Sequence, residues 1–327
     1  MRRIAATDWL QALLSKSQRW LARWRGPGRE VRVPPAALRE PGASPAQAIQ
    51  PLKRVLVTAD VAKQMFQEYG AHRMTERGEE EIGWVLLGRR DLNEATVLAS
   101  LPAGADRQSG EAHVIFNSIA QVVGYRYVWQ VDRRLVMLGV AHTHPGSLRH
   151  PTDGDYRGDI EWVGQLRGGE GIFGIGTADG KFAGHGDEIW SPRDNIQAFG
   201  DLCLTWYSLR TEARNYCTIP VQIIAGPDLA VPLRSVWPIL EANGERLDRL
   251  AQQLAKVRFE VIAQSNQPAL AVSVNLPEGE RGLRAVLREK EIHYFLIREG
   301  SILATDLLEP LVDRGIYRLL ADQAGGA

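Results

Sequence analysis

The sequence has few cysteines, no long apolar run and no excess of charge of either sign. Cys203 and Cys217 are the only cysteines among 327 residues, too few for a disulfide framework or for a zinc site built from thiolates. We therefore expect a protein of a reducing compartment, of which the cytoplasm is the simplest.

The missing apolar runs and the balanced charge argue against membrane-spanning, secreted and nucleic-acid-binding proteins. No apolar run approaches the roughly 18 residues that a membrane-spanning helix needs. Asp8 and Gln11 follow the Arg-Arg start where a signal peptide would be apolar, so we expect no signal peptide. Basic and acidic residues number 39 each, so no overall positive potential attracts nucleic acid, and no nucleic-acid partner is expected.

The remaining composition is that of an ordinary globular protein. Hydrophobic residues make up 44% and charged residues 24% of the chain, which is typical of soluble domains. The length suits two modest domains, each with its own core. We divide the chain into an N-terminal amphipathic helix (1–25), a proline-rich linker (26–52), a central domain (53–207) and a small α/β domain of unknown role (208–327).

The N-terminal segment is rich in tryptophan. Apolar residues recur at helical spacing with bases on the opposite side, namely Trp9, Leu10, Leu13, Leu14, Trp20, Leu21 and Trp24. Three interpretations remain open: packing on the protein's own body, which we favour, docking to a partner, and contact with a membrane surface.

The central segment alternates between strand-like and helix-like patterns. We predict strands at 54–58, 81–88, 94–101, 112–116, 135–142 and 171–177, and helices at 59–69, 118–132 and 156–166. Mixed elements in this order indicate an α/β or α+β domain with a sheet flanked by helices.

One stretch of this segment carries metal-binding chemistry. An apolar run ends in His142-Thr143-His144-Pro145, and Thr152-x-x-Asp155 follows after a polar loop. Side chains two apart in a strand share a face, so the two imidazoles lie side by side. Asp155 can return as a third ligand, and two imidazoles plus a carboxylate suit a catalytic zinc that keeps a water.

These residues resemble the JAMM signature of the MPN (JAB) domain metalloproteases, Glu…His-[Ser/Thr]-His-Pro…[Ser/Thr]-x-x-Asp. The matching acid is Glu81, 61 positions before His142. The resemblance covers about residues 55–207 and implies an MPN-like mixed sheet. It also implies that His142, His144 and Asp155 hold Zn²⁺, that Glu81 is general base and then acid, and that Thr152 stabilises the oxyanion.

Each part of the signature also has a structural interpretation. His-x-His can be two surface histidines, Glu81 follows Glu79 and Glu80 in a charge run, and Thr152-x-x-Asp155 is what a helix capping box looks like. Trp84 stands where the family often has a small residue, which leaves Glu80 as an alternative acid. The spacing to Gly88 and His142 favours Glu81.

The C-terminal segment shows no comparable cluster. We expect helices at 201–213, 236–263 and 281–290, strands at 218–225, 269–274 and 292–297, and a mixed stretch at 302–320 that ends in a helix. Three strands alternating with helices suggest a small α/β module for recognition or dimerisation.

The resemblance implies a zinc-dependent isopeptidase or peptidase that cleaves after the C-terminal tail of a ubiquitin-like modifier. Its expected partners are such a modifier or its conjugates, with activating or conjugating enzymes. A catalytically silent MPN scaffold and a metallohydrolase acting on a small peptide or amide remain as alternatives.

Overall fold

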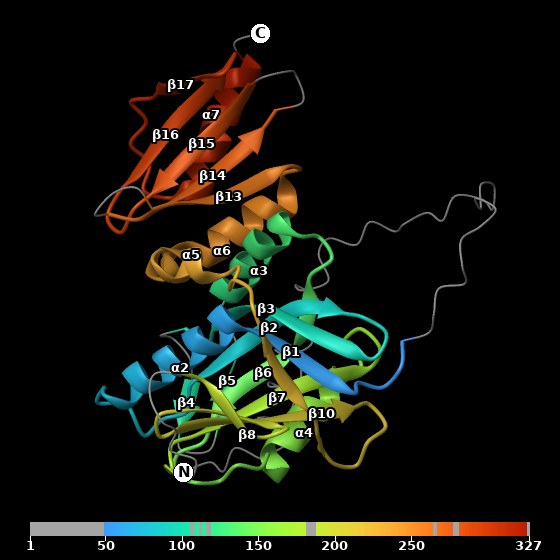
Figure 1. The fold of residues 1–327 in the computed structure, drawn as a ribbon. Helices are drawn as coiled ribbons and strands as arrows, with labels where there is room; N and C mark the ends of the chain where they lie inside the picture. The colour runs from blue at the N-terminus through green and yellow to red at the C-terminus, as the bar shows by residue number, and fades with distance from the viewer. Residues whose placement is uncertain are drawn as a thin grey trace, which may run out of the picture. The chain divides into compact units, whose positions relative to one another are not determined.

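The computed structural model describes residues 49–104, 108–110, 113–115, 119–180, 188–263, 267–276 and 281–325. The predicted N-terminal helix (1–25) and most of the predicted linker (26–52) lie outside these residues. The chain divides into two compact units (Figure 1). The first holds the described residues of 1–100, 108–116 and 136–228, and the second those of 101–107, 117–135 and 229–327.

A mixed sheet forms the first unit, with ten strands among the described residues. Nine follow the order β12-β1-β3-β2-β6-β7-β10-β9-β8, and β11 pairs with β10. The bounds are β1 Arg54–Thr58, β2 Gly83–Arg90, β3 Glu94–Pro102, β6 Val136–Thr143, β7 Glu170–Thr177, β8 Trp190–Arg193, β9 Ile196–Phe199, β10 Leu202–Arg210, β11 Cys217–Thr218 and β12 Val221–Ile224. A separate pair is β4 (Gln108–Gly110) with β5 (His113–Ile115).

Helix α2 (Ala59–Arg73) packs on one face of this sheet. Its buried side chains, Met65 and Phe66 among them, belong to one hydrophobic cluster with Trp84 of β2 and Trp206 of β10. The Trp84 indole N–H also donates to the carboxylate of Glu68 on α2. Because side chains alternate along a strand, residues one position away on β2 face the opposite side of the sheet.

Helix α4 (Asp153–Val163) lies on that opposite face. Its Trp162 ring contacts Phe173 of β7, with ring centroids 5.7 Å apart. Phe173 is the register partner of Val140 in β6, two residues before His142. The histidine side of β6 therefore faces α4, and the sheet separates it from α2.

The helix predicted for residues 201–213 is wrong, and the strand predicted for residues 218–225 is confirmed in part. The predicted helix 201–213 is mostly strand β10, and the predicted boundary at residue 207 falls inside that strand. All residues from Leu202 to Leu209 are buried, so no alternation of apolar and polar residues marks the strand. The predicted strand 218–225 is divided into β11 and β12, and β12 runs parallel to β1 at the far edge of the sheet.

The second unit contains a five-stranded antiparallel sheet in the order β13-β14-β15-β16-β17. Its strands are β13 Val257–Ile262, β14 Ala269–Asn275, β15 Arg281–Leu287, β16 Ile292–Arg298 and β17 Ser301–Ala304. Its helices are α3 Ile119–Val131, α5 Val231–Arg234, α6 Trp237–Gln253 and α7 Val312–Gly325. Helix α7 packs on the sheet: the ring of Tyr294 lies directly against Gly315, where a Cβ would meet ring atoms at 2.2 Å.

One predicted helix in this unit is wrong, and another is too long. Residues 281–290, predicted as helix, begin with strand β15, in which Leu283, Val286 and Leu287 mimic the spacing of an amphipathic helix. Pairing with β14 and β16 overrides that local pattern. The predicted helix 236–263 ends at Gln253, and β13 follows after Lys256, which adopts a positive φ of 66°.

Both units combine strands and helices, so the predicted α+β class is correct at that level. The second unit differs from the predicted alternation, because five consecutive strands form a meander between helices α6 and α7. No helix among the described residues is long and apolar enough to cross a bilayer.

Candidate metal centre

The two histidines lie where β6 ends. His142 pairs with Gly83 of β2 on one side and Ile175 of β7 on the other. His144 continues the strand direction, because its backbone N–H donates to the carbonyl of Gly176 at 2.8 Å. Both side chains are buried, and the two-residue repeat sets both imidazoles on the α4 face.

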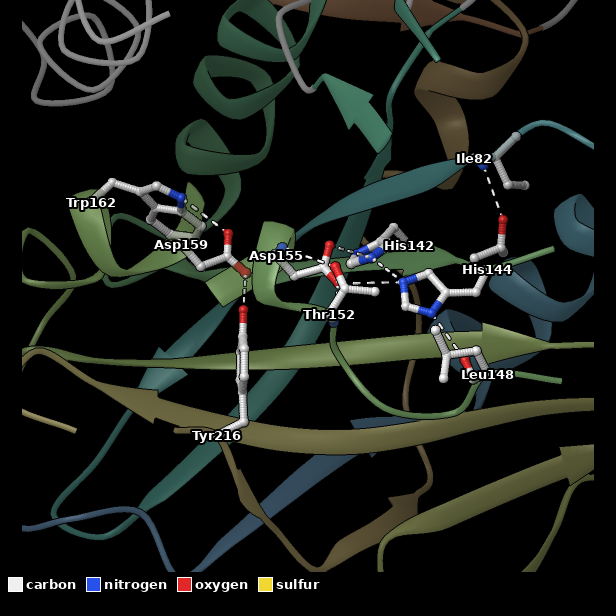
Figure 2. Close-up of polar contacts among 10 residues, drawn as sticks. Ile82, His142, His144, Leu148, Thr152, Asp155, Asp159, Trp162 and Tyr216 are labelled. Carbon is white, nitrogen blue, oxygen red and sulfur yellow. Dashed lines mark hydrogen bonds and ion pairs between the residues drawn. The ribbon is translucent and has the colours of Figure 1, made fainter. Parts of the chain in front are cut away.

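Asp155 completes a compact group with these imidazoles (Figure 2). The Nε2 atoms of His142 and His144 are 3.0 Å apart. The Asp155 carboxylate lies 3.2 Å from His142 Nε2 through Oδ1 and 3.5 Å from His144 Nε2 through Oδ2. Among the described residues, this is the one group of three or more such donors close enough to hold a metal ion.

A capping box at the start of α4 positions Asp155. The Thr152 hydroxyl accepts from the Asp155 N–H at 3.2 Å, and the Thr152 N–H donates to Asp155 Oδ2 at 2.5 Å. The Thr152 hydroxyl also donates to Oδ2 at 2.8 Å. The capping interpretation of Thr152-x-x-Asp155 is therefore correct, and the same contacts hold the carboxylate towards the histidines.

The hydrogen bonds of His144 select its ring tautomer. Nδ1 lies 2.9 Å from the carbonyl oxygen of Leu148, which only accepts, so Nδ1 carries the proton. In the neutral ring, Nε2, on the side of Asp155, then carries the lone pair that a cation can bind. A donor to one ring nitrogen and a metal on the other is the usual arrangement around a ligating histidine, so the triad fits a metal ion.

Charge coupling within the triad appears in the pKa values. Burial raises the pKa of Asp155, but hydrogen bonds from His142 and His144 outweigh it and hold that pKa well below its usual range. Burial lowers the pKa of His144, and the hydrogen bond and charge of Asp155 outweigh that effect, so the pKa of His144 is raised. The Asp155 carboxylate therefore stays ionised, and a metal cation can take the place of the proton that this carboxylate favours on His144.

Glu81 lies on the same face as the triad. It directly precedes β2, and the Ile82 carbonyl accepts from the Thr143 N–H at 2.9 Å. Continuing this register sets Glu81 opposite His144. The side chain is 2% exposed, and burial raises its pKa to about 7, with smaller effects from the charges of His144 and Asp155. Such a carboxyl is suited to exchange protons near neutral pH.

The neighbouring acid has a different environment. Glu80 accepts from the Arg77 guanidinium, with Nη2 2.6 Å from Oε2, in an ion pair on the turn between α2 and β2. Trp84, the departure from the family pattern, points to the α2 face and leaves the α4 face of β2 to Gly83 and Val85. The geometry therefore favours Glu81 over Glu80 as the acid beside the triad.

Replacing Glu81 with glutamine is expected to stabilise the metal-free protein above pH 7. The pKa of Glu81 is about 7 in the folded protein and 4.5 in the unfolded chain. The folded protein therefore has its full stability below pH 4.5 and loses part of it as the pH rises to about 7. At 1.36 kcal/mol per pH unit this loss is about 3 kcal/mol at most. Urea unfolding with chelator present, at pH 5 and pH 8, measures it.

Glu79→Gln, at an exposed position two residues earlier, provides the matched control. The difference between Glu81→Gln and the parent protein should grow by about 2 kcal/mol or more from pH 5 to pH 8. Equal pH dependence for Glu79→Gln and Glu81→Gln would mean that Glu81 is not desolvated.

Asp159 is a further acid near the triad that the signature does not include. It lies one turn after Asp155 on α4, and its carboxylate accepts from the Tyr216 hydroxyl at 2.7 Å and the Trp162 indole at 3.2 Å (Figure 2). Burial, followed by the charge of Asp155 among the raising effects, raises the pKa of Asp159 to about 8. In the sequence, the signal for this position is its spacing of four residues from Asp155, which sets the two acids on the same side of a helix.

Comparisons with known proteins identify no family for this chain. No family model and no curated protein matches the chain. Among solved structures, the solution structure of a protein from Desulfitobacterium hafniense aligns at 19% identity over 53% of this chain and 94% of that one. The TM-score of 0.34 is too low to support an argument about fold or function.

Proposed function

We propose that this chain is a zinc-dependent peptidase of the JAMM type with an MPN-like central fold. The observation that carries the proposal is the meeting of three donors, from His142, His144 and Asp155, with a buried acid, Glu81, on one face of the sheet. These are four residues of one signature, and Glu81 comes from a part of the chain 61 positions before His142.

The donor separations support zinc as the metal. Ligand atoms that are each 2.0–2.1 Å from a tetrahedral zinc lie roughly 3.3 Å from one another. The two Nε2 atoms are 3.0 Å apart, and each has one Asp155 oxygen at a similar distance, Oδ1 at 3.2 Å from His142 and Oδ2 at 3.5 Å from His144. Two imidazoles and one carboxylate, with a fourth position left for water, are also a common donor set for a catalytic zinc.

The proposed chemistry divides between the metal and the side chains. A bound zinc would polarise the scissile carbonyl and make a water molecule acidic near neutral pH. The Glu81 carboxylate then accepts a proton from the attacking water and delivers it to the leaving nitrogen. Its buried position keeps competing bulk water away and holds its pKa near the pH of action.

Thr152 can also act as a hydrogen-bond donor in the reaction. Its hydroxyl donates to Asp155 Oδ2 in the metal-free protein. When the carboxylate binds a cation, that oxygen becomes a weaker acceptor, and the hydroxyl can turn to a developing oxyanion. We propose this role for Thr152 beside its structural one as the cap of α4.

The substrate class follows from the resemblance to the JAMM isopeptidases. We propose that the chain cleaves after the C-terminal tail of a ubiquitin-like modifier, either to mature it or to release it from a target. Partners would then be the modifier, its conjugates and its activating or conjugating enzymes.

Cleavage of a linear ubiquitin-like fusion tests the proposal. The zinc-loaded protein is expected to cut after the modifier tail, chelation to abolish cleavage, and added Zn²⁺ to restore it. Cleavage that persists in chelator contradicts the mechanism. Stoichiometric zinc without turnover of any substrate would favour a silent scaffold, and turnover of short peptides alone would favour a small-substrate hydrolase.

A further inference from the structure

The loop between β6 and α4, residues 145–151, forms part of the outer surroundings of the metal centre. Its Leu148 carbonyl accepts from His144 Nδ1 at 2.9 Å. This contact holds the proton on Nδ1 and turns Nε2 towards Asp155 (Figure 2). The position of the Leu148 carbonyl therefore decides how well His144 is oriented as a ligand.

Tyr207 of β10 contacts the same loop at Arg149, the residue after Leu148. Its hydroxyl donates to the carbonyl of Arg149 at 2.8 Å. A hydroxyl has one proton, so its contact with His150 Nδ1 at 3.0 Å has His150 as the donor. One buried hydroxyl thus contacts two consecutive loop residues.

The tyrosine is itself rigidly placed. Its strand is paired with β7 through Phe173, its register partner, and its ring packs near those of His150 and Tyr216 at centroid distances of 6.3 Å each. A second contact, an ion pair between Arg149 and Asp179, secures the loop at the end of β7. The loop is therefore fastened to β10 through Tyr207 and to the segment that follows β7 through Asp179.

We propose that Tyr207 is a positioning residue for His144, which holds residues 148–150 so that the Leu148 carbonyl fixes the tautomer and direction of the imidazole. The inference rests on the metal centre of the proposed function and does not require its hydrolytic reaction. Tyr207 contacts neither the metal nor substrate in this assignment, and it acts through the loop.

The expected size of the effect follows from other outer contacts of metal ligands. Their removal lowers metal affinity by about 10–100-fold. Because Tyr207 acts through one intervening carbonyl, and the Arg149–Asp179 pair remains, we expect Tyr207→Phe to lower Zn²⁺ affinity by about 10-fold, at the lower end of that range.

Tyr294→Phe is the matched control. Tyr294 is also buried, and its hydroxyl also donates to a backbone carbonyl, that of Glu309 at 2.9 Å, but it belongs to β16 of the second unit. Both variants lose one buried hydroxyl, so both lose roughly 1 kcal/mol of stability. An effect confined to metal binding then separates positioning from general destabilisation.

The experiment measures Zn²⁺ binding by competition with a chromophoric chelator and records the visible spectrum of the Co²⁺-substituted full chain. Tyr207→Phe should show the 10-fold loss and altered Co²⁺ bands, and Tyr294→Phe should match the parent protein within twofold. His150→Ala, which leaves the Tyr207–Arg149 contact in place, should stay within about threefold.

Three results would overturn the inference. Unchanged affinity and spectrum in a folded Tyr207→Phe protein would remove the positioning role alone and leave the metal centre standing. Loss of binding in His150→Ala comparable to that of a ligand deletion would make His150 a ligand instead. If the parent protein binds neither Zn²⁺ nor Co²⁺, both the inference and the proposed function fail.

Discussion

The Glu81→Gln variant is expected to lose about 10²–10⁴-fold in kcat/KM for a ubiquitin-like fusion while it still binds zinc. Glutamine keeps the shape of the side chain but has no carboxylate to accept a proton. Because Glu81 is outside the three-donor group, zinc affinity should change by no more than a few-fold. Progress curves with zinc-loaded protein, together with metal analysis of the same sample, measure both quantities.

Glu80→Gln provides the control for this variant. It removes the neighbouring carboxylate, which accepts from Arg77 in an exposed pair, and it should keep kcat/KM within about threefold. The outcome that would refute the assignment is the reverse order, with Glu80→Gln inactive and Glu81→Gln active. The combination of higher stability at pH 8 and lost activity in Glu81→Gln would show that the buried acid is kept for function at a cost in stability.

The Asp155→Asn variant is expected to lower Zn²⁺ affinity by more than about 100-fold, beyond the range for outer contacts of a ligand. The amide is neutral and a poor zinc ligand, so the site loses its anionic donor and the charge that attracts the cation. The parent protein should gain about 2.7 kcal/mol of unfolding free energy at a zinc concentration 100 times its Kd, and the variant close to none. Thermal unfolding with and without Zn²⁺ measures the difference.

Asp153→Asn is matched to this change. Asp153 is in the same first turn of α4 and carries the same charge, but it is exposed and is not in the donor group. It loses the same favourable interaction with the helix dipole, typically 0.3–1 kcal/mol, and should keep the full stabilisation by zinc. Zinc-induced stabilisation of Asp155→Asn equal to that of Asp153→Asn would remove Asp155 from the ligand set.

Local patterns in the sequence were enough to predict the elements that carry the triad. The predicted strand 135–142 is β6, and the predicted helix 156–166 is α4, which begins three residues earlier, at Asp153 after its Thr152 cap, and ends at Val163. Two-residue alternation placed His142 and His144 together, and the i, i+3 relation of Thr152 and Asp155 predicted their reciprocal hydrogen bonds. These relations involve residues only a few positions apart, so they can be predicted from the sequence without knowledge of the tertiary structure.

The failures share a different physical cause. Strand β10 is buried on both faces and shows no alternation, and β15 has the apolar spacing of a helix. Each is a strand because strands outside the segment pair with it on both sides, namely β7 and β9 for β10, and β14 and β16 for β15. Pairing energy of that kind has no signature within the segment itself.

For the candidate site, too, some features followed from the sequence and others only from the tertiary structure. The sequence by itself identified the three candidate donors and, through the resemblance to the JAMM signature, the role proposed for Glu81, because these depend on residue type and spacing. Only the tertiary structure decided that Glu81 is buried across the β2–β6 pair from His144, and that Tyr207 and Tyr216 brace the loop and helix of the ligands. Those contacts join segments 50 or more residues apart, and the folded sheet is what brings them within hydrogen-bonding distance.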